Sequence, residues 1–265
     1  MMAPPTTAHR GHPMGPRGAP SWPVGCSARF GAGWRRPELR RVAALIMLCL
    51  LAACASRPPP PGWQLNAKAA SERSVAAYLS GNARVDAQEL ARARSEIART
   101  GRADLLARIE LTRCAAQAAS LVFGPCAAFE ALRADADAPE RAYADHLAAR
   151  IAASDIALLP EPQRAVAAGA GAGAQGEAPN VAALRAIDDP LSRLVAAGVL
   201  FEAGRADPQV IAIAIDTASA QGWRRPLLAW LGVELRRAER SGAVEDADRL
   251  RRRIALVEGG SAAVP

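Results

Sequence analysis

Helix-length segments rich in Ala, Leu and Arg follow one another from residue 66 onward, each about 10 to 18 residues long and bounded by Gly, Pro, Asp or Asn. Ala supplies 64 of the 265 residues, whereas Trp, Tyr and Phe together supply only 11. Strands favour aromatic and β-branched residues, and Ala is the best helix former. Segments of this length and composition are typical of short packed helices. The sequence therefore predicts an all-α fold.

Proline and glycine mark the expected ends of these helices. Proline suits a first helical turn, because its missing N–H has no partner there, and glycine suits the position after a last turn. Such residues stand at Pro139, Pro190, Pro208 and Pro226 and at Gly81, Gly101, Gly204 and Gly242. Asp86 and Glu89 have the spacing of a capping box. We expect helices at residues 67–80, 86–100, 103–121, 126–134, 139–152, 162–168, 181–187, 190–203, 208–221, 226–240 and 244–257.

The last two expected helices show the clearest apolar periodicity. Their stripes consist of Leu228, Leu231, Leu235 and Ala238 and of Ala247, Leu250, Ile254 and Val257. Two pairs at i,i+4, Glu245 with Arg249 and Asp248 with Arg252, predict ion pairs on the exposed face. Because only Ser241 and Gly242 lie at their junction, the two segments predict an antiparallel helical hairpin.

Two stretches of the chain are less regular. Residues 210–215 alternate at period two, as a strand would, but Asp207-Pro208 is a good helix start and no partner strand is visible, so we expect a helix. Residues 167–179 contain Gly and Ala without a bulky side chain. This composition predicts a flexible linker between an N-terminal helical half (66–166) and a C-terminal half (180–258), which a short tail (259–265) follows.

The basic character of the chain is concentrated at its start. The whole sequence has a net charge of +7, but residues 1–53 contain seven Arg and one Glu, so residues 54–265 carry a net charge of only +1. Arg35, Arg36, Arg40 and Arg41 precede the apolar run 42–53, which is too short to span a bilayer and fits the h-region of a signal peptide. The nearly neutral remainder argues against a nucleic-acid partner.

Leu51-Ala52-Ala53-Cys54 resembles the lipobox of bacterial lipoproteins, and a Pro-rich tether follows within residues 54–65. The resemblance implies cleavage before Cys54 and acylation of that residue. A cleaved secretory signal with an incidental Cys is the alternative. Ala55 stands where an Asp would retain the protein in the inner membrane of enterobacteria, so the resemblance implies the periplasmic face of the outer membrane. The long Pro-, Gly- and Arg-rich stretch before the signal indicates a mis-assigned start codon.

The C-terminal half resembles tetratricopeptide-type helical hairpins. Leu194-Val195-Ala196-Ala197-Gly198 and Leu228-Ala229-Trp230-Leu231-Gly232 lie 34 residues apart, which is the period of that family. Gly101-Arg102-Ala103-Asp104 recurs at residues 204–207. The resemblance implies an α-solenoid with a protein-binding surface. Most aromatic signature positions are missing, so an irregular helical bundle is the alternative.

The segment after Cys54 contains two cysteines, Cys114 and Cys126. An even pair in an oxidising compartment predicts a disulfide, which would stabilise the fold by about 3 kcal/mol on the chain-entropy model. Its formation requires the chain around residues 120–125 to double back. Two buried thiols, or a redox or metal role, are the alternatives.

Few residues qualify for catalysis or metal binding. His146 is the only His after the signal, and we expect it at the edge of the core. A zinc site would need both cysteines as well, so we predict no metal and no cofactor. Carboxylates at Glu110, Glu130 or Glu202 are candidates for a cell-envelope hydrolase.

Arginines gather on the last two helices, at Arg236, Arg237, Arg240, Arg249 and Arg252. We interpret them as an exposed face paired with nearby acids, or else as a contact for an acidic protein or lipid headgroups. The leading hypothesis is a non-enzymatic, lipid-anchored scaffold for envelope proteins. A peptidoglycan hydrolase and a structural lipoprotein without a dedicated ligand are the alternatives.

Overall fold

The computed structural model describes residues 59–171 and 177–259, and every regular element in these ranges is helical. The predicted all-α class is confirmed. The predicted signal peptide, its N-terminal extension, the lipobox and the tail from residue 260 lie outside the described residues. The elements are α2 (Gly62–Ser80), α3 (Ala83–Ala98), α4 (Ala103–Ala119), α5 (Ala127–Glu130), α6 (Ala138–Leu147), the 3-10 helix η1 (Ala153–Leu158), α7 (Glu161–Gly171), α8 (Glu177–Arg185), α9 (Pro190–Glu202), α10 (Pro208–Ala220), α11 (Arg224–Arg240) and α12 (Val244–Val257).

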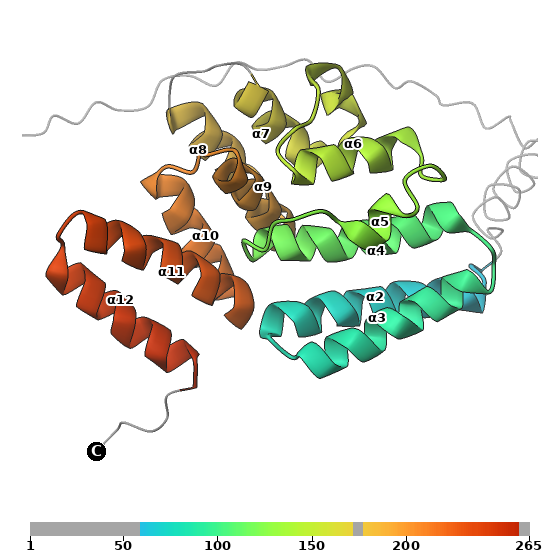
Figure 1. Ribbon diagram of the computed structural model, residues 1–265, viewed down its shortest axis with the longest axis horizontal. Helices are drawn as coiled ribbons and strands as arrows, with labels where there is room; N and C mark the ends of the chain where they lie inside the picture. The colour runs from blue at the N-terminus through green and yellow to red at the C-terminus, as the bar shows by residue number, and fades with distance from the viewer. Residues whose placement is uncertain (1–58, 172–176, 260–265) are drawn as a thin grey trace, which may run out of the picture. The chain divides into compact units, whose positions relative to one another are not determined.

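The first two described helices form a hairpin. Helices α2 and α3 pack side by side along their length (Figure 1). Gly81 closes α2 with a φ of +85°, which only glycine adopts without strain, and the Asn82 side chain caps α3 by accepting from the Val85 N–H. The predicted capping role of Asp86 is wrong. That carboxylate is buried between helices, where it accepts from the Ser74 hydroxyl and pairs with Arg113.

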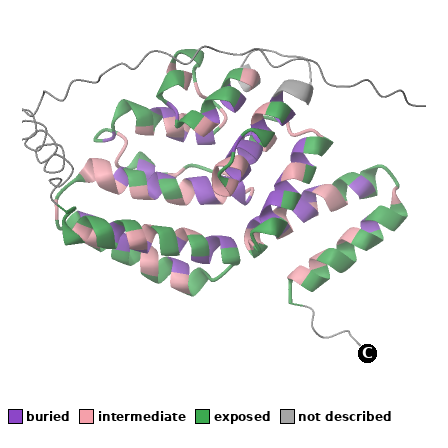
Figure 2. Cartoon of the chain, turned by 180° about the vertical axis from the view of Figure 1, so that it is seen from behind, coloured by how far each residue is buried: buried purple, intermediate pink, exposed green. Residues whose placement is uncertain are grey.

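The core is centred on the crossing of α4 and α9. Seven consecutive residues of α9, from Leu194 to Leu200, are buried, and Figure 2 shows a long purple stretch in this helix. Gly198 permits the close approach, because a Cβ there would lie 2.9 Å from the backbone carbon of Ala118. The small residues of α4 and α9 therefore bring two helix backbones into contact.

Helices α9 to α12 pack in chain order, each against the next, and the last two form the predicted hairpin. The period-two segment lies in α10 and is helical as predicted, with the Asp207 side chain capping the helix by accepting from the Val210 N–H. Helix α12 is mostly exposed, as the green in Figure 2 shows, and Ala247 is its buried residue. A tetratricopeptide repeat stays a prediction.

Several predicted boundaries are wrong. Helix α2 begins at Gly62, so the expected tether (54–65) ends earlier than predicted. Helix α7 continues to Gly171 and α8 begins at Glu177, so the expected linker (167–179) is helical at both ends. Val166 and Ala167 are buried against the core, which explains why α7 persists into the Gly/Ala stretch. The expected helix 126–134 shortens to the four residues of α5.

The two predicted halves share one hydrophobic core, which includes residues from Ala107 on α4 to Val233 on α11. The Trp230 indole N–H donates to the Ala119 carbonyl at 3.2 Å, and the Arg225 Nε donates to the Tyr78 carbonyl at 2.8 Å. The halves are therefore not separate domains.

Candidate functional site

A disulfide joins Cys114 on α4 to Cys126 just before α5, with 6.1 Å between the Cα atoms. The chain doubles back between them as the prediction requires. Leu121 takes a left-handed φ of 57°, which lets the Leu121 N–H donate to the Ala118 carbonyl and the Val122 N–H to the Gln117 carbonyl. The disulfide interpretation is confirmed, and neither Cys is a free thiol.

The disulfide forms part of the wall of a cavity of about 500 Å³, which we call the disulfide pocket. Its wall combines apolar side chains from α4 and α6, a short loop, and charged side chains that include Glu202 at the end of α9. The lining residues are Cys114, Gln117, Ala118, Val122, Phe123, Gly124, Pro125, Cys126, Glu130, Ala144, Leu147, Ala148, Arg150 and Glu202. This combination suits a ligand that has both an apolar and a polar part.

Most charges at the pocket are balanced by neighbours. Glu130 accepts from the Arg133 Nε at 2.8 Å and lies 3.9 Å from an Arg150 guanidinium nitrogen. Both arginines also pair with Asp145, at 2.6 and 3.1 Å. The Glu202 carboxylate, by contrast, makes no hydrogen bond or ion pair with any described residue. The negative charge of Glu202 is therefore not balanced by a described neighbour.

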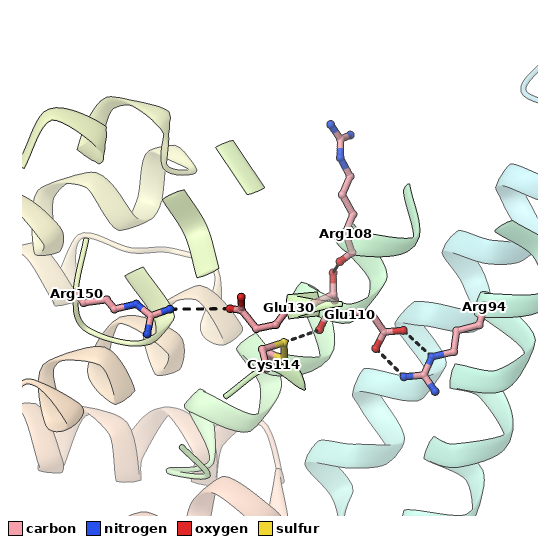
Figure 3. The surroundings of a disulfide bond; sticks show 8 residues. Arg94, Arg108, Glu110, Cys114, Glu130 and Arg150 are labelled. Atoms are coloured by element: carbon pink, nitrogen blue, oxygen red, sulfur yellow. Dashed lines mark hydrogen bonds and ion pairs between the residues drawn. A yellow bond between two sulfur atoms is a disulfide. The ribbon is translucent and has the colours of Figure 1, made fainter. Parts of the chain in front are cut away.

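The three carboxylates proposed for hydrolysis do not share a site. Glu130 and Glu202 both line the disulfide pocket. Glu110 is only 4% exposed, and both of its oxygens accept hydrogen bonds from Arg94 at 2.6 Å. Figure 3 shows the Glu110 carboxylate turned towards Arg94 and that of Glu130 turned towards Arg150. Glu110 therefore serves packing between α3 and α4 rather than a pocket.

His146 is fully buried, so its predicted place at the edge of the core is wrong. Gln163, on α7, covers the imidazole, and the His146 Nε2 lies 3.1 Å from the Gln163 Oε1. The Gln163 amide in turn donates to the Ser192 carbonyl at 2.9 Å. Burial lowers the pKa of the His146 imidazole. This histidine joins α6, α7 and α9 within the fold.

The arginines of α11 and α12 lie on an exposed surface, as predicted, but their ion pairs differ from the expected i,i+4 set. Arg237 pairs with Glu234 and Arg249 with Asp246, both at i,i+3. Arg251, which was not in the predicted patch, bridges Glu239 on α11 and Asp248 on α12 at 2.6 and 2.7 Å. No ion pair within the described chain involves Arg236, Arg240 or Arg252. The paired arginines therefore contact acids three residues away on the same helix or an acid on the neighbouring helix.

The disulfide pocket was missed by sequence reasoning, although some of its residues were singled out. Glu130 and Glu202 are 72 positions apart, and only the packing of α4, α6 and α9 brings them to one cavity. One indication of the pocket was present in the sequence, which was the requirement that the chain double back between Cys114 and Cys126.

The described part of the chain contains neither a cluster of metal ligands nor a helix that could span a membrane. No group of three or more His, Cys, Asp or Glu residues in 59–171 and 177–259 could hold a metal ion. None of the helices described is both long and apolar enough to span a bilayer.

No protein-family model, curated protein or solved structure matches the chain.

Proposed function

We propose that this chain is a lipoprotein of the outer membrane, anchored on the periplasmic face through Cys54, whose helical unit binds an envelope partner without catalysing a reaction. The observation that carries the binding role is the disulfide pocket, which combines apolar walls with an unpaired carboxylate beside a rigid disulfide. The disulfide itself supports an oxidising compartment such as the periplasm. Two or three acyl chains hold a protein essentially permanently at a membrane, so the helical unit needs no membrane surface of its own.

Replacing the anchor cysteine tests the localisation. Cys54→Ser should move the protein from the outer-membrane fraction to an unprocessed or soluble form, while Cys49→Ser, within the apolar run, should leave fractionation unchanged. The measured intact mass should match a mature protein that begins at an acylated Cys54. Equal fractionation of the two variants, or a mature N-terminus upstream of residue 54, would contradict the anchor.

Crosslinking in intact cells tests the binding role. Wild-type protein should give a discrete crosslinked partner, and Val122→Glu, which places a charge on the 51%-exposed rim of the pocket, should abolish it. Val244→Glu, at the 68%-exposed start of α12, is the matched control. If both variants keep the crosslink, the pocket is not the binding surface. If wild type gives none, a structural lipoprotein without a ligand is the better description.

A hydrolase is the second candidate, because Glu130 and Glu202 line the same pocket and glycoside hydrolysis needs two carboxylates. Clearing of a peptidoglycan gel by wild type and its loss in Glu130→Gln and Glu202→Gln would support it. Glu245→Gln, which lies exposed on α12, should clear like wild type. No clearing by wild type removes this candidate.

A further inference from the structure

Three helices end at the wall of the disulfide pocket. The last turns of α4, α6 and α9 contribute Ala118, Leu147 and Glu202 to its lining. The C-terminal end of a helix carries a partial negative charge of about half an elementary charge, and cations are favoured beside it. Three such ends at one cavity create a place where a positive group is stabilised before any side chain is considered.

The side chains add to this negative potential. The pairs that Glu130 and Asp145 make with Arg133 and Arg150 balance one another, so they leave no net charge. Glu202 has no such partner and is the last residue of α9, the end of a helix where a carboxylate is least favourable. A cation at this position would relieve both the unpaired carboxylate and the helix terminus. Glu202 is exposed, so a cation can reach its carboxylate from the open side of the pocket.

Another part of the pocket wall is apolar. Val122 is half exposed, and the Phe123 ring stacks on that of Phe201 with centroids 6.2 Å apart. Because Phe201 is itself held edge-on by Trp230 at 5.7 Å, this wall is anchored to the core. Aromatic and aliphatic surface next to a carboxylate suits an ammonium group carried on an apolar body.

We propose that the disulfide pocket binds an organic cation, with its ammonium group between Glu202 and the converging helix ends and its apolar part on Val122 and Phe123. In the proposed function the occupant is a basic side chain of the envelope partner that lies next to an apolar one, and a small aromatic amine reproduces this chemistry as a probe. The inference rests on the proposed binding role of the chain and names the chemistry that the pocket selects.

Three matched probes test the proposal on the full mature protein in detergent: 4-fluorophenethylamine, 2-(4-fluorophenyl)ethanol and 3-(4-fluorophenyl)propionate. Ligand-detected ¹⁹F NMR gives a Kd for each. The amine should bind at least tenfold more tightly than the alcohol, and the carboxylate should show no saturable binding. Glu202→Gln should weaken the amine about five- to tenfold and leave the alcohol unchanged, because only the charged contact is removed.

Glu245→Gln is the control, since it removes one exposed carboxylate from α12, away from the pocket lining. It should preserve the preference for the amine. Equal binding of amine and alcohol by wild type, an amine affinity that Glu202→Gln leaves unchanged, or no binding of any probe would overturn the proposal. Detergent partitioning affects wild type and variants alike, so the difference between them reports the site.

The outcomes separate this inference from the proposed function. If no probe binds while the crosslinked partner depends on Val122, the chain is a binding protein whose pocket does not select a cation. If the amine binds through Glu202 but neither a crosslinked partner nor membrane anchoring is found, the pocket is a cation site in a chain with a different function.

Discussion

His146 shows how a single buried residue couples the fold to pH. The Gln163 amide donates to the Ser192 carbonyl, so its Oε1 is an acceptor, and the His146 Nε2 facing it must carry the proton. The Nδ1 atom is buried without a hydrogen-bond partner, and burial lowers the pKa of the ring. The folded chain therefore holds this histidine neutral.

The free energy of unfolding should fall as the pH is lowered from 7.5 to 5.5. In the unfolded chain His146 takes up a proton near pH 6.5, whereas in the folded chain it does so only at a lower pH, so acid favours unfolding. His146→Gln keeps a donor towards Gln163 and removes the titration, so its loss of stability over this range should be smaller by about 1 kcal/mol. Urea titrations at both pH values measure the difference. Every other titratable group is common to wild type and variant, so an unchanged pH dependence in the variant would contradict this account.

At the scale of elements, the contact between α4 and α9 depends on the absence of one Cβ. Gly198→Ala would push a methyl group into the Ala118 backbone, which cannot move aside as a flexible side chain could. We expect a loss of about 2 kcal/mol or more in unfolding free energy.

Gly232 lies on α11, where a Cβ would meet only the end of the Arg236 side chain at 3.6 Å. Gly232→Ala should therefore stabilise by about 0.5 to 1 kcal/mol. Chemical denaturation of both variants checks the opposite signs, and two similar values would show that α4 and α9 do not meet as closely as described.

The helices were predictable because their boundaries are local. Pro190 and Pro208 start α9 and α10, and the expected helix 244–257 is identical to α12. Asp86 was assigned wrongly as a cap because its partners, Ser74 and Arg113, belong to neighbouring helices. Sequence spacing reports what lies one turn away, but it carries no information on which helices pack together.

The same limit applies to the candidate site. The pairing of Cys114 with Cys126 was predictable from their number and compartment, whereas the meeting of Glu130 with Glu202 depends on tertiary packing. Gly198 likewise occurs in an Ala/Gly run that resembles many others in this chain, and only the crossing of two helices distinguishes it.

At the scale of the whole helical unit, Tyr78 links its beginning to its end. The ring lies between the guanidinium groups of Arg113 on α4 and Arg225 on α11, at 4.0 and 4.3 Å from its centroid. The Tyr78 carbonyl also accepts from Arg225. Because of these contacts, unfolding of α2 would also remove packing from α11. The described residues should therefore unfold as one cooperative unit.

Unfolding in urea should therefore give a single transition, with helical circular dichroism and tryptophan fluorescence changing together. Tyr78→Ala removes a buried ring and both cation–π contacts, which should cost about 3 kcal/mol and shift both signals equally. Leu256→Ala, at a position that is 74% exposed, should shift neither. If the halves folded independently, Tyr78→Ala would move only part of the dichroism change and leave the signal from Trp230 in place, because that residue lies on α11. A shared shift is expected because the Trp230 indole donates to Ala119 of the other half, so α11 cannot keep its packing once α4 has lost its own.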